Sequence, residues 1–293
     1  MSTRATLYTP GQSFLHKLNP LTKMVILLAL LVIIFPLMNP FILFALAGVA
    51  VLLAIAAGVF RDFVQGMSIL IPAAFAMAFF QTFWPAIPPP HRPILSIGLL
   101  TAYHEGLYYG LVFAGRILAM GAFALLIVQV THPVDLFVSL LKIGVPYMLG
   151  FMTLVTLQLV PILMREASTI IQAQQSRGMK ARGLTAIIPS MIPLFASSME
   201  RVQQLAMSLE ARAFGSSGKK TSLREMRMRG VDYAVVVVTV AATAAAVLYF
   251  NQHGWFNYLR TYTFPLSLAV ALIALVTIGF VGMAAYFLAR LAG

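Results

Sequence analysis

The sequence has no cysteine and few acidic residues, and both shortages narrow its function. Without cysteine it offers no disulfide, no thiol nucleophile and no cysteine-based metal site. Only 8 residues are acidic, against 20 lysines and arginines, and charged residues make up 10% of the 293 positions. Hydrophobic residues make up 60%. Because a soluble globule cannot hide so large an apolar fraction, we predict an integral membrane protein.

Apolar runs of helical length divide the chain. We predict an all-α fold of about six transmembrane helices, because a membrane-spanning helix needs roughly 20 mainly apolar residues. The predicted spans are residues 21–38, 40–59, 63–84, 106–130, 232–250 and 264–289. A loop rich in proline follows the third span.

A long basic insertion separates the fourth and fifth spans. Of the 20 basic residues, 11 lie between Arg165 and Arg229, together with four acidic residues. Basic segments of membrane proteins favour the cytoplasm. The sequence therefore predicts a membrane domain over 1–130, a cytoplasmic domain over 131–230 and a C-terminal membrane segment over 231–293. We expect the protein to lie in the plasma membrane with its N-terminus in the cytoplasm.

One apolar segment of the insertion conflicts with this topology. Residues 145–163 are apolar enough to span a membrane, but a crossing there would place the basic residues outside. We therefore interpret 133–163 as an interfacial or packed helix, with a further helix over 162–177.

Residues 190–214 have the pattern of an amphipathic helix. We predict that Ser190 caps it, that Pro193 lies in its first turn and that Gly215 ends it. Its apolar stripe has spacings of three and four residues and consists of Ile192, Phe195, Met199, Val202, Ala206 and Leu209. The stripe suits either a partner subunit or packing within the chain.

Each of these two helices ends in an arginine between small residues. The two triplets are Ser176-Arg177-Gly178 and Ala211-Arg212-Ala213. Small neighbours allow close approach of another protein, and a guanidinium binds carboxylates or helix carbonyls there. The alternative is that each arginine only stabilises the end of its own helix.

Other chemistry finds little support in the sequence. The segment from Ala213 to Thr221 lacks the spacing of a phosphate-binding loop, the five histidines are scattered, and no acidic pair suggests general acid–base catalysis. We predict no catalytic, cofactor-binding or metal-binding residues. Arg116 is the one basic residue well inside a predicted span, and we favour a structural role for it over a functional one.

Four short segments carry a family resemblance: Gln175–Gly178, Glu210–Phe214, His16–Lys23 and Thr131–Pro133. They resemble motifs of the transmembrane T component of energy-coupling factor (ECF) transporters, which are ATP-driven uptake systems. The resemblance covers residues 10–250, and the last span matches least well.

The segments also depart from the family pattern. Ser176 stands where the family has alanine, Ala213 where it has glycine, and Asn19 where it has aspartate. The triplet Ala181-Arg182-Gly183 offers a second register for the first arginine motif, so Arg182 is the alternative to Arg177.

The resemblance implies a non-catalytic scaffold for uptake of a vitamin or metal ion. In this family, long crossing coupling helices dock through their arginines on two ATPase subunits. The ATPase subunits bind ATP and magnesium. The coupling helices also hold a separate membrane subunit that captures the substrate. The rival interpretation is a self-contained carrier or channel. That class predicts acidic residues or broken helices within the membrane, and the predicted spans carry acids only near their ends.

Overall fold

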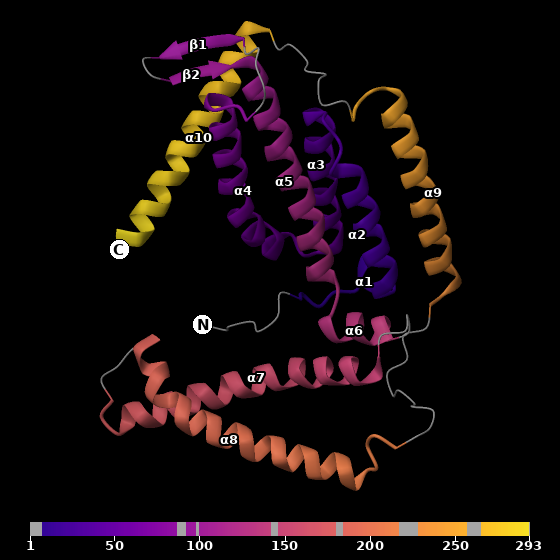
Figure 1. Cartoon of the computed structure of the whole chain (residues 1–293), viewed down its shortest axis with the longest axis vertical. Helices are drawn as coiled ribbons and strands as arrows, with labels where there is room; N and C mark the ends of the chain where they lie inside the picture. Colours follow the sequence, from indigo (N-terminus) through magenta and orange to yellow (C-terminus); the bar gives the residue numbers. More distant parts are fainter. Residues whose placement is uncertain are drawn as a thin grey trace. The chain divides into compact units, whose positions relative to one another are not determined.

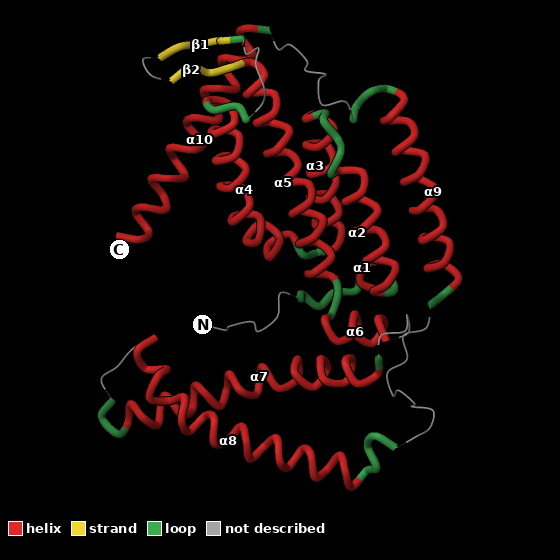
Figure 2. Tube along the Cα trace, in the orientation of Figure 1, coloured by secondary structure: helices red, strands yellow, loops and turns green. Residues whose placement is uncertain are grey.

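The computed structural model describes residues 8–86, 92–97, 100–141, 146–179, 184–216, 228–256 and 265–292. These residues form helices almost throughout, with one small β-hairpin (Figures 1 and 2). The chain divides into two compact units. The membrane unit holds the described residues within 7–132 and 227–293, and the insertion unit holds those within 133–226. The two predicted membrane segments thus belong to one unit.

The membrane unit contains seven helices and two strands among its described residues. They are α1 (Phe14–Lys17), α2 (Pro20–Ile34), α3 (Pro40–Ala57), α4 (Phe60–Phe83), β1 (Pro93–Ile97), β2 (Leu100–Tyr103), α5 (His104–Val130), α9 (Gly230–Gln252) and α10 (Leu266–Ala292). By length and composition α3, α4, α5 and α9 can each span a membrane, while α2 and the Leu266–Gly282 part of α10 are shorter apolar helices.

Hydrogen bonds at the helix ends show which helix ends lie together at each end of the membrane unit. Thr9, just before α1, donates its N–H to the carbonyl of Gln129 near the end of α5 (3.0 Å) and its hydroxyl to Asp62 near the start of α4 (2.7 Å). We call this end, where α2 also begins, the near end. At the far end, the N–H of Met38 donates to the carbonyl of Trp255 (3.0 Å), beyond α9.

The first span is shorter than the predicted 21–38. Helix α2 stops at Ile34 because Pro36 cannot continue it, and the turn runs to Asn39. Asn39 then caps α3, its side chain accepting a hydrogen bond from the N–H of Phe41 (3.0 Å), with Pro40 as the first helical residue.

Small residues bring α4 and α5 into close contact. A Cβ on Gly110 would lie 2.8 Å from the carbonyl oxygen of Ala78, and one on Gly106 would lie 2.5 Å from that of Gln81. Ala114 continues this side of α5 one turn further on and is buried. We call Gly106, Gly110 and Ala114 the small-residue seam. This spacing of four residues is the usual device by which membrane helices approach closely.

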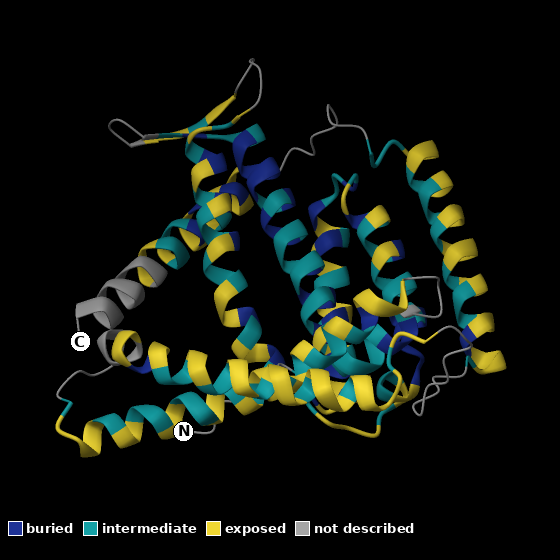
Figure 3. Ribbon diagram, turned by 60° about the horizontal axis from the view of Figure 1, so that its bottom comes forward, coloured by how far each residue is buried: buried dark blue, intermediate teal, exposed yellow. Residues whose placement is uncertain are grey.

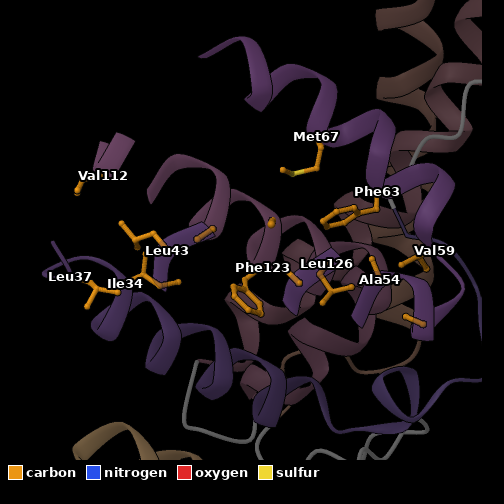
Figure 4. Packing of buried hydrophobic residues seen from close by; sticks show 14 of the residues in the cluster. Ile34, Leu37, Leu43, Ala54, Val59, Phe63, Met67, Val112, Phe123 and Leu126 are labelled. Carbon is orange, nitrogen blue, oxygen red and sulfur yellow. The ribbon is translucent and has the colours of Figure 1, made fainter. Parts of the chain in front are cut away.

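The main core of the membrane unit lies among α2, α3, α4 and α5. Ile34, Leu37 and Leu43 belong to it near the α2–α3 turn, and Phe63 and Phe123 line it further along (Figure 4). Burial of these side chains fixes the first four spans as one body.

The proline-rich loop after α4 contains structure that the sequence did not indicate. Strands β1 and β2 pair antiparallel, with Ser96 opposite Thr101. The N–H of His104 donates to the carbonyl of Arg92 (3.0 Å), which joins the hairpin to the start of α5. Prolines 88, 89 and 90 lie outside the described residues.

The insertion unit consists of α6 (Pro133–Leu141), α7 (Tyr147–Ser176) and α8 (Leu184–Ala211). Helix α7 is one continuous helix that passes through Pro161, so the helix predicted over 162–177 starts about four turns earlier than expected.

The predicted start of α8 is wrong. The helix begins at Leu184, so Ser190 is not its cap but a buried residue in its second turn. Pro189 and Pro193 both lie inside the helix. The first turns of α8 lie at an angle to the rest (Figure 1), as expected where proline removes a helical hydrogen bond and its ring crowds the preceding turn.

Candidate functional site

The two long helices of the insertion unit cross and are tied together by polar and aromatic contacts. Arg201 of α8 donates to the carboxylate of Glu166 of α7 at 3.1 Å. Phe214, just past the end of α8, packs against Tyr147 and Phe151 at the start of α7, with ring centroids 6.2 and 4.4 Å apart. The end of α8 therefore lies beside the beginning of α7.

Helix α7 ends in a Schellman motif built around Arg177. The N–H of Met179 donates to the carbonyl of Gln174 (3.1 Å), and the N–H of Gly178 donates to the carbonyl of Gln175 (3.0 Å). Gly178 has a φ of 95°, in the left-handed region that this motif requires. Arg177 is thus the C-cap residue, between Ser176 and the left-handed glycine.

Helix α8 ends with the same hydrogen bonds around Arg212. The N–H of Phe214 donates to the carbonyl of Leu209 (2.9 Å), and the N–H of Ala213 donates to that of Glu210 (2.9 Å). Ala213 occupies the left-handed position with a φ of 54°, although alanine is disfavoured there. Gly215, the predicted stop, lies beyond this turn with its own φ of 94°.

The two predicted arginines therefore occupy the same backbone position at two helix ends. All six residues of the two triplets are exposed. From Phe151, which marks the Arg212 end, α7 runs about 26 residues to Arg177, so the two guanidiniums lie roughly 40 Å apart at 1.5 Å per residue. Arg182, the alternative first arginine, lies outside the described residues.

The predicted apolar stripe of α8 remains largely exposed. Ile192 is 79% exposed and Phe195 is 66% exposed, and the other stripe residues are exposed except for half-buried Leu209. Because the helix begins earlier than predicted, Ile188 and Met191 extend the same stripe, and both are also exposed. Figure 3 shows most of α7 and α8 as exposed or half-buried.

A different and more polar face of α8 turns toward α7. Its half-buried residues include Leu194, Ser197, Arg201 and Leu205, spaced three and four residues apart. This face is rotated by about a third of a turn from the stripe, as follows from 100° per residue. The sequence identified the apolar stripe, but the structure shows that α8 packs on α7 with its neighbouring face.

The threading of the membrane unit bears on whether α7 crosses a membrane. By length and composition α7 is a candidate span, whereas α8 is not among the described candidates. The chain leaves the membrane unit after Val130 and returns before Asp232, and both residues lie at the near end, held by the start of α2. A non-crossing insertion requires its two ends to lie on one side of the membrane, which this arrangement satisfies, and the interpretation of 133–163 as an interfacial or packed helix stays a prediction.

Arg116 of α5 lies against the turn between α2 and α3. Its guanidinium donates to the carbonyl of Leu37 (3.1 Å) and lies over the rings of Phe35 and Phe113, at 5.7 and 5.3 Å from their centroids. The hydroxyl of Tyr108 bonds the next carbonyl, that of Met38 (2.6 Å). Non-helical backbone among apolar helices requires such donors, so the structural role of Arg116 accounts for its place.

Metal-ligating side chains do not gather in the part of the chain that the structure describes. No group of three or more histidine, cysteine, aspartate or glutamate residues comes together there. The candidate site consists of two exposed helix ends and an exposed apolar helix face.

Comparison with known proteins identifies the family. The profile of the CbiQ family, described as cobalt transport protein, matches residues 11–223. The chain is 28% identical over 263 residues to the energy-coupling factor transporter transmembrane protein EcfT of Thermosediminibacter oceani, covering 82% of this chain and 95% of that protein. It is 30% identical to EcfT of Bacillus selenitireducens (82% and 94%) and 29% identical to EcfT of Bacillus subtilis (83% and 96%).

The CbiQ profile match, residues 11–223, includes the first turn of α2 and both arginine triplets, and it ends before α9. The relatives are named as transmembrane components of transporters, which agrees with a membrane protein that is not itself catalytic. The chain belongs to the CbiQ family and is an energy-coupling transmembrane component of the ECF type.

Proposed function

We propose that this chain transmits the movement of two ATPase subunits to a separate membrane subunit that captures a micronutrient, either a vitamin or a metal ion. The observation that carries the proposal is the repeated C-cap geometry of Arg177 and Arg212 at the two ends of the α7–α8 pair. Two equivalent sites roughly 40 Å apart on one rigid helix pair suit two equivalent partners.

Each arginine would bind in a groove of one ATPase subunit. A C-cap arginine lies next to the last carbonyls of its own helix, and its five donors can bind carboxylates of a partner. The small residues on either side, Ser176 with Gly178 and Ala211 with Ala213, would let the partner approach the backbone. ATP and magnesium would be bound by those subunits, since this sequence lacks a phosphate-binding loop.

The capture subunit would contact the exposed stripe of α8. Large apolar side chains such as Ile188, Ile192 and Phe195 are costly to leave in water, and a contiguous exposed patch of them marks a binding surface. Because α8 packs on α7 through its other face, the same helix can bind a partner on one side and α7 on the other. A packed helix pair moves as a rigid body, so displacement at its ends would reach the stripe.

The insertion unit and the N-terminus would face the cytoplasm of a cell whose plasma membrane holds the membrane unit. The basic excess between Arg165 and Arg229 favours that side, where ATP is available.

The decisive experiment reverses the charge of both C-cap arginines. In Arg177→Glu/Arg212→Glu we expect the chain to insert normally but to lose its ATPase subunits, because a carboxylate replaces each guanidinium in its groove. The measurement is the amount of ATPase subunit that co-purifies with the tagged chain from native membranes.

Arg165→Glu is the matched control, because Arg165 is also exposed on α7 but lies outside both triplets. It should leave co-purification unchanged. If the double variant retains its ATPase subunits at the wild-type ratio, the docking role of the two arginines is wrong.

A further inference from the structure

Two segments of chain connect the insertion unit to the membrane unit, and the first turn of α2 is bonded to the helix from which each of them leaves, α5 and α9. The insertion unit begins at Pro133, three residues after Val130, and the chain is back in a described helix at Gly230. Asn19, Thr22 and Lys23 lie within four residues of one another and bond to the last residue of α5 and to the first turn of α9. We call these three residues the α2 anchor.

Lys23 holds the outgoing connection. Its ammonium is buried, with 3% of the residue exposed, and donates to the carbonyl of Val130 at 2.8 Å and to that of His16 at 3.5 Å. Val130 is the last residue of α5, where the helix carbonyls have no partner within the helix. A cation at this position donates a hydrogen bond to a free carbonyl and is stabilised by the negative end of the helix dipole.

Asp232 holds the returning connection. Its residue is 4% exposed, and its two carboxylate oxygens bond to two helix starts at once. Oδ2 accepts the N–H of Arg229 (2.9 Å) at the start of α9, and Oδ1 accepts the N–H of Asn19 (3.0 Å) and the hydroxyl of Thr22 (3.5 Å) at the start of α2. One carboxylate therefore caps α9 and α2 together.

Both contacts place charged groups where water is excluded, and such burial is costly unless geometry and hydrogen bonds compensate for it. The same end of α2 is joined to the rest of the membrane unit by Thr9, which bonds to Gln129 and Asp62. The helix ends from which the two connections leave are thus fixed to one point of the membrane unit, chiefly by the buried bonds from Lys23 to Val130 (2.8 Å) and from Asn19 to Asp232 (3.0 Å).

We infer that the α2 anchor is the fixed point against which the insertion unit moves, with Lys23 and Asp232 as positioning residues for energy coupling. The inference rests on the proposed function, since it supposes that ATPase subunits displace the insertion unit. If both connections were free, displacement of the insertion unit would only bend them. With both held at one point, the displacement acts on the partner bound to α8.

Spin-label distances in the purified complex test this directly, and the lack of native cysteine allows labels to be placed by single substitutions. The pair Gln12→Cys/Tyr233→Cys measures the anchor distance, and the pair Gln12→Cys/Gln203→Cys measures the lever distance between anchor and α8. All three sites are exposed. In the otherwise unaltered complex we expect ATP to shift the lever distance and to leave a single narrow anchor distance unchanged.

Lys23→Met should separate the movement of the insertion unit from that of the membrane unit. We expect its complex to retain the ATPase subunits and to hydrolyse ATP, while the anchor distance broadens and the ATP-dependent shift of the lever distance is lost. Lys17→Met is the matched control, because it removes the same charge from an exposed position six residues away. If Lys23→Met fails to insert, Asp232→Asn replaces it, since the amide keeps one acceptor oxygen but loses the charge.

An anchor distance that shifts with ATP, or a Lys23→Met complex that responds as Lys17→Met does, overturns the inference. Failure of the proposed function has a different signature: the ATPase subunits do not co-purify with the unaltered chain, while the anchor distance can still be measured in that chain alone.

Discussion

Helices α5 and α7 are of similar length and are both apolar enough to span a membrane, yet the fold uses them in opposite ways. Of the most apolar stretch of α5, 44% is buried inside the protein, against 6% for α7. Helix α5 buries residues along its whole length against α3 and α4, whereas Gly150 is the one buried residue described on α7. Within the membrane unit α5 is thus covered by other helices of the same chain, whereas α7 and α8 keep most of their surface exposed.

Apolar composition alone therefore does not decide which side chains of a helix meet its neighbours. In the membrane unit, small residues on α5 set the contact and large ones fill the space around it. In the insertion unit, α8 turns serines and an ion pair toward α7 and leaves isoleucine and phenylalanine exposed. Substitutions should therefore affect folding in the first unit and assembly in the second.

The largest effect on stability is expected at the small-residue seam. Gly110→Ala places a Cβ 2.8 Å from a backbone oxygen of α4, which cannot move without displacing the helix. We expect a loss of about 3 kcal/mol in the free energy of unfolding, measured by denaturation in detergent.

Gly48→Ala is the matched control. Gly48 is exposed in the middle of α3, and a Cβ there meets no atom within 4 Å. The same substitution should be neutral or stabilise by up to about 1 kcal/mol, because alanine favours a helix over glycine. Equal losses at both positions would show that the seam is not a close contact.

A smaller loss is expected at Arg116. Arg116→Leu leaves the carbonyl of Leu37 without this donor, and we expect a loss of about 2 kcal/mol, as for other hydrogen bonds to charged groups. Arg116→Lys keeps a donor and should lose less. Thermal denaturation in detergent measures both, and folded Arg116→Leu should still bind its ATPase subunits. Loss of that binding with unchanged stability would assign Arg116 a functional role instead.

Long apolar runs made most of the membrane unit predictable. The predicted bounds of α3, α4, α5 and α9 lie within about three residues of the observed ones, because helices of this length must match the bilayer. The all-α membrane fold and the family were also correct. What the sequence did not reveal depends on contacts between distant segments: the α4–α5 seam, the β-hairpin and the bonds of Asp232 to the start of α2.

In the insertion unit, the helix ends were harder to predict from the sequence than the helices themselves. The sequence predicted that α8 starts at Ser190 with Pro193 in its first turn, but α8 begins at Leu184 and continues through both Pro189 and Pro193 with a bend. The arginine triplets were recognised from their small neighbours, and Gly178 could be expected to end α7. The left-handed conformation of Ala213 was not predicted, because alanine is the best helix former and Gly215 was expected to end the helix; the one signal was the glycine that the family has at this position.

The shared left-handed conformation of Gly178 and Ala213 can be tested by substitutions that should change the stability of the two helix ends in opposite directions. Gly178→Ala should weaken the end of α7 by about 1 kcal/mol, because its left-handed φ disfavours a Cβ. Ala213→Gly should strengthen the end of α8 by a similar or slightly smaller amount, ~0.5–1 kcal/mol. Hydrogen exchange of the amides at Met179 and Phe214, which close the two motifs, measures both changes.

Ala211→Gly provides the control for Ala213→Gly. It makes the same chemical change two residues earlier, in the last helical position, where glycine should weaken the helix end by roughly 1 kcal/mol. If both substitutions speed exchange at Phe214, Ala213 does not have the left-handed conformation.

The smallest effect on stability is expected on the exposed stripe, where the effect on assembly should be complete. Phe195→Glu exchanges an exposed side chain for a charged one, so the free energy of unfolding should change by no more than about 0.5 kcal/mol. A carboxylate buried without a partner in an apolar interface is far more costly, so the capture subunit should be lost from the complex while the ATPase subunits remain. Gln204→Glu adds the same charge on the side of α8 away from the stripe and should keep all subunits. If Phe195→Glu still co-purifies with the capture subunit, the stripe has another partner. The contrast between a self-contained membrane unit and a partner-binding insertion unit would then depend on the two arginines alone.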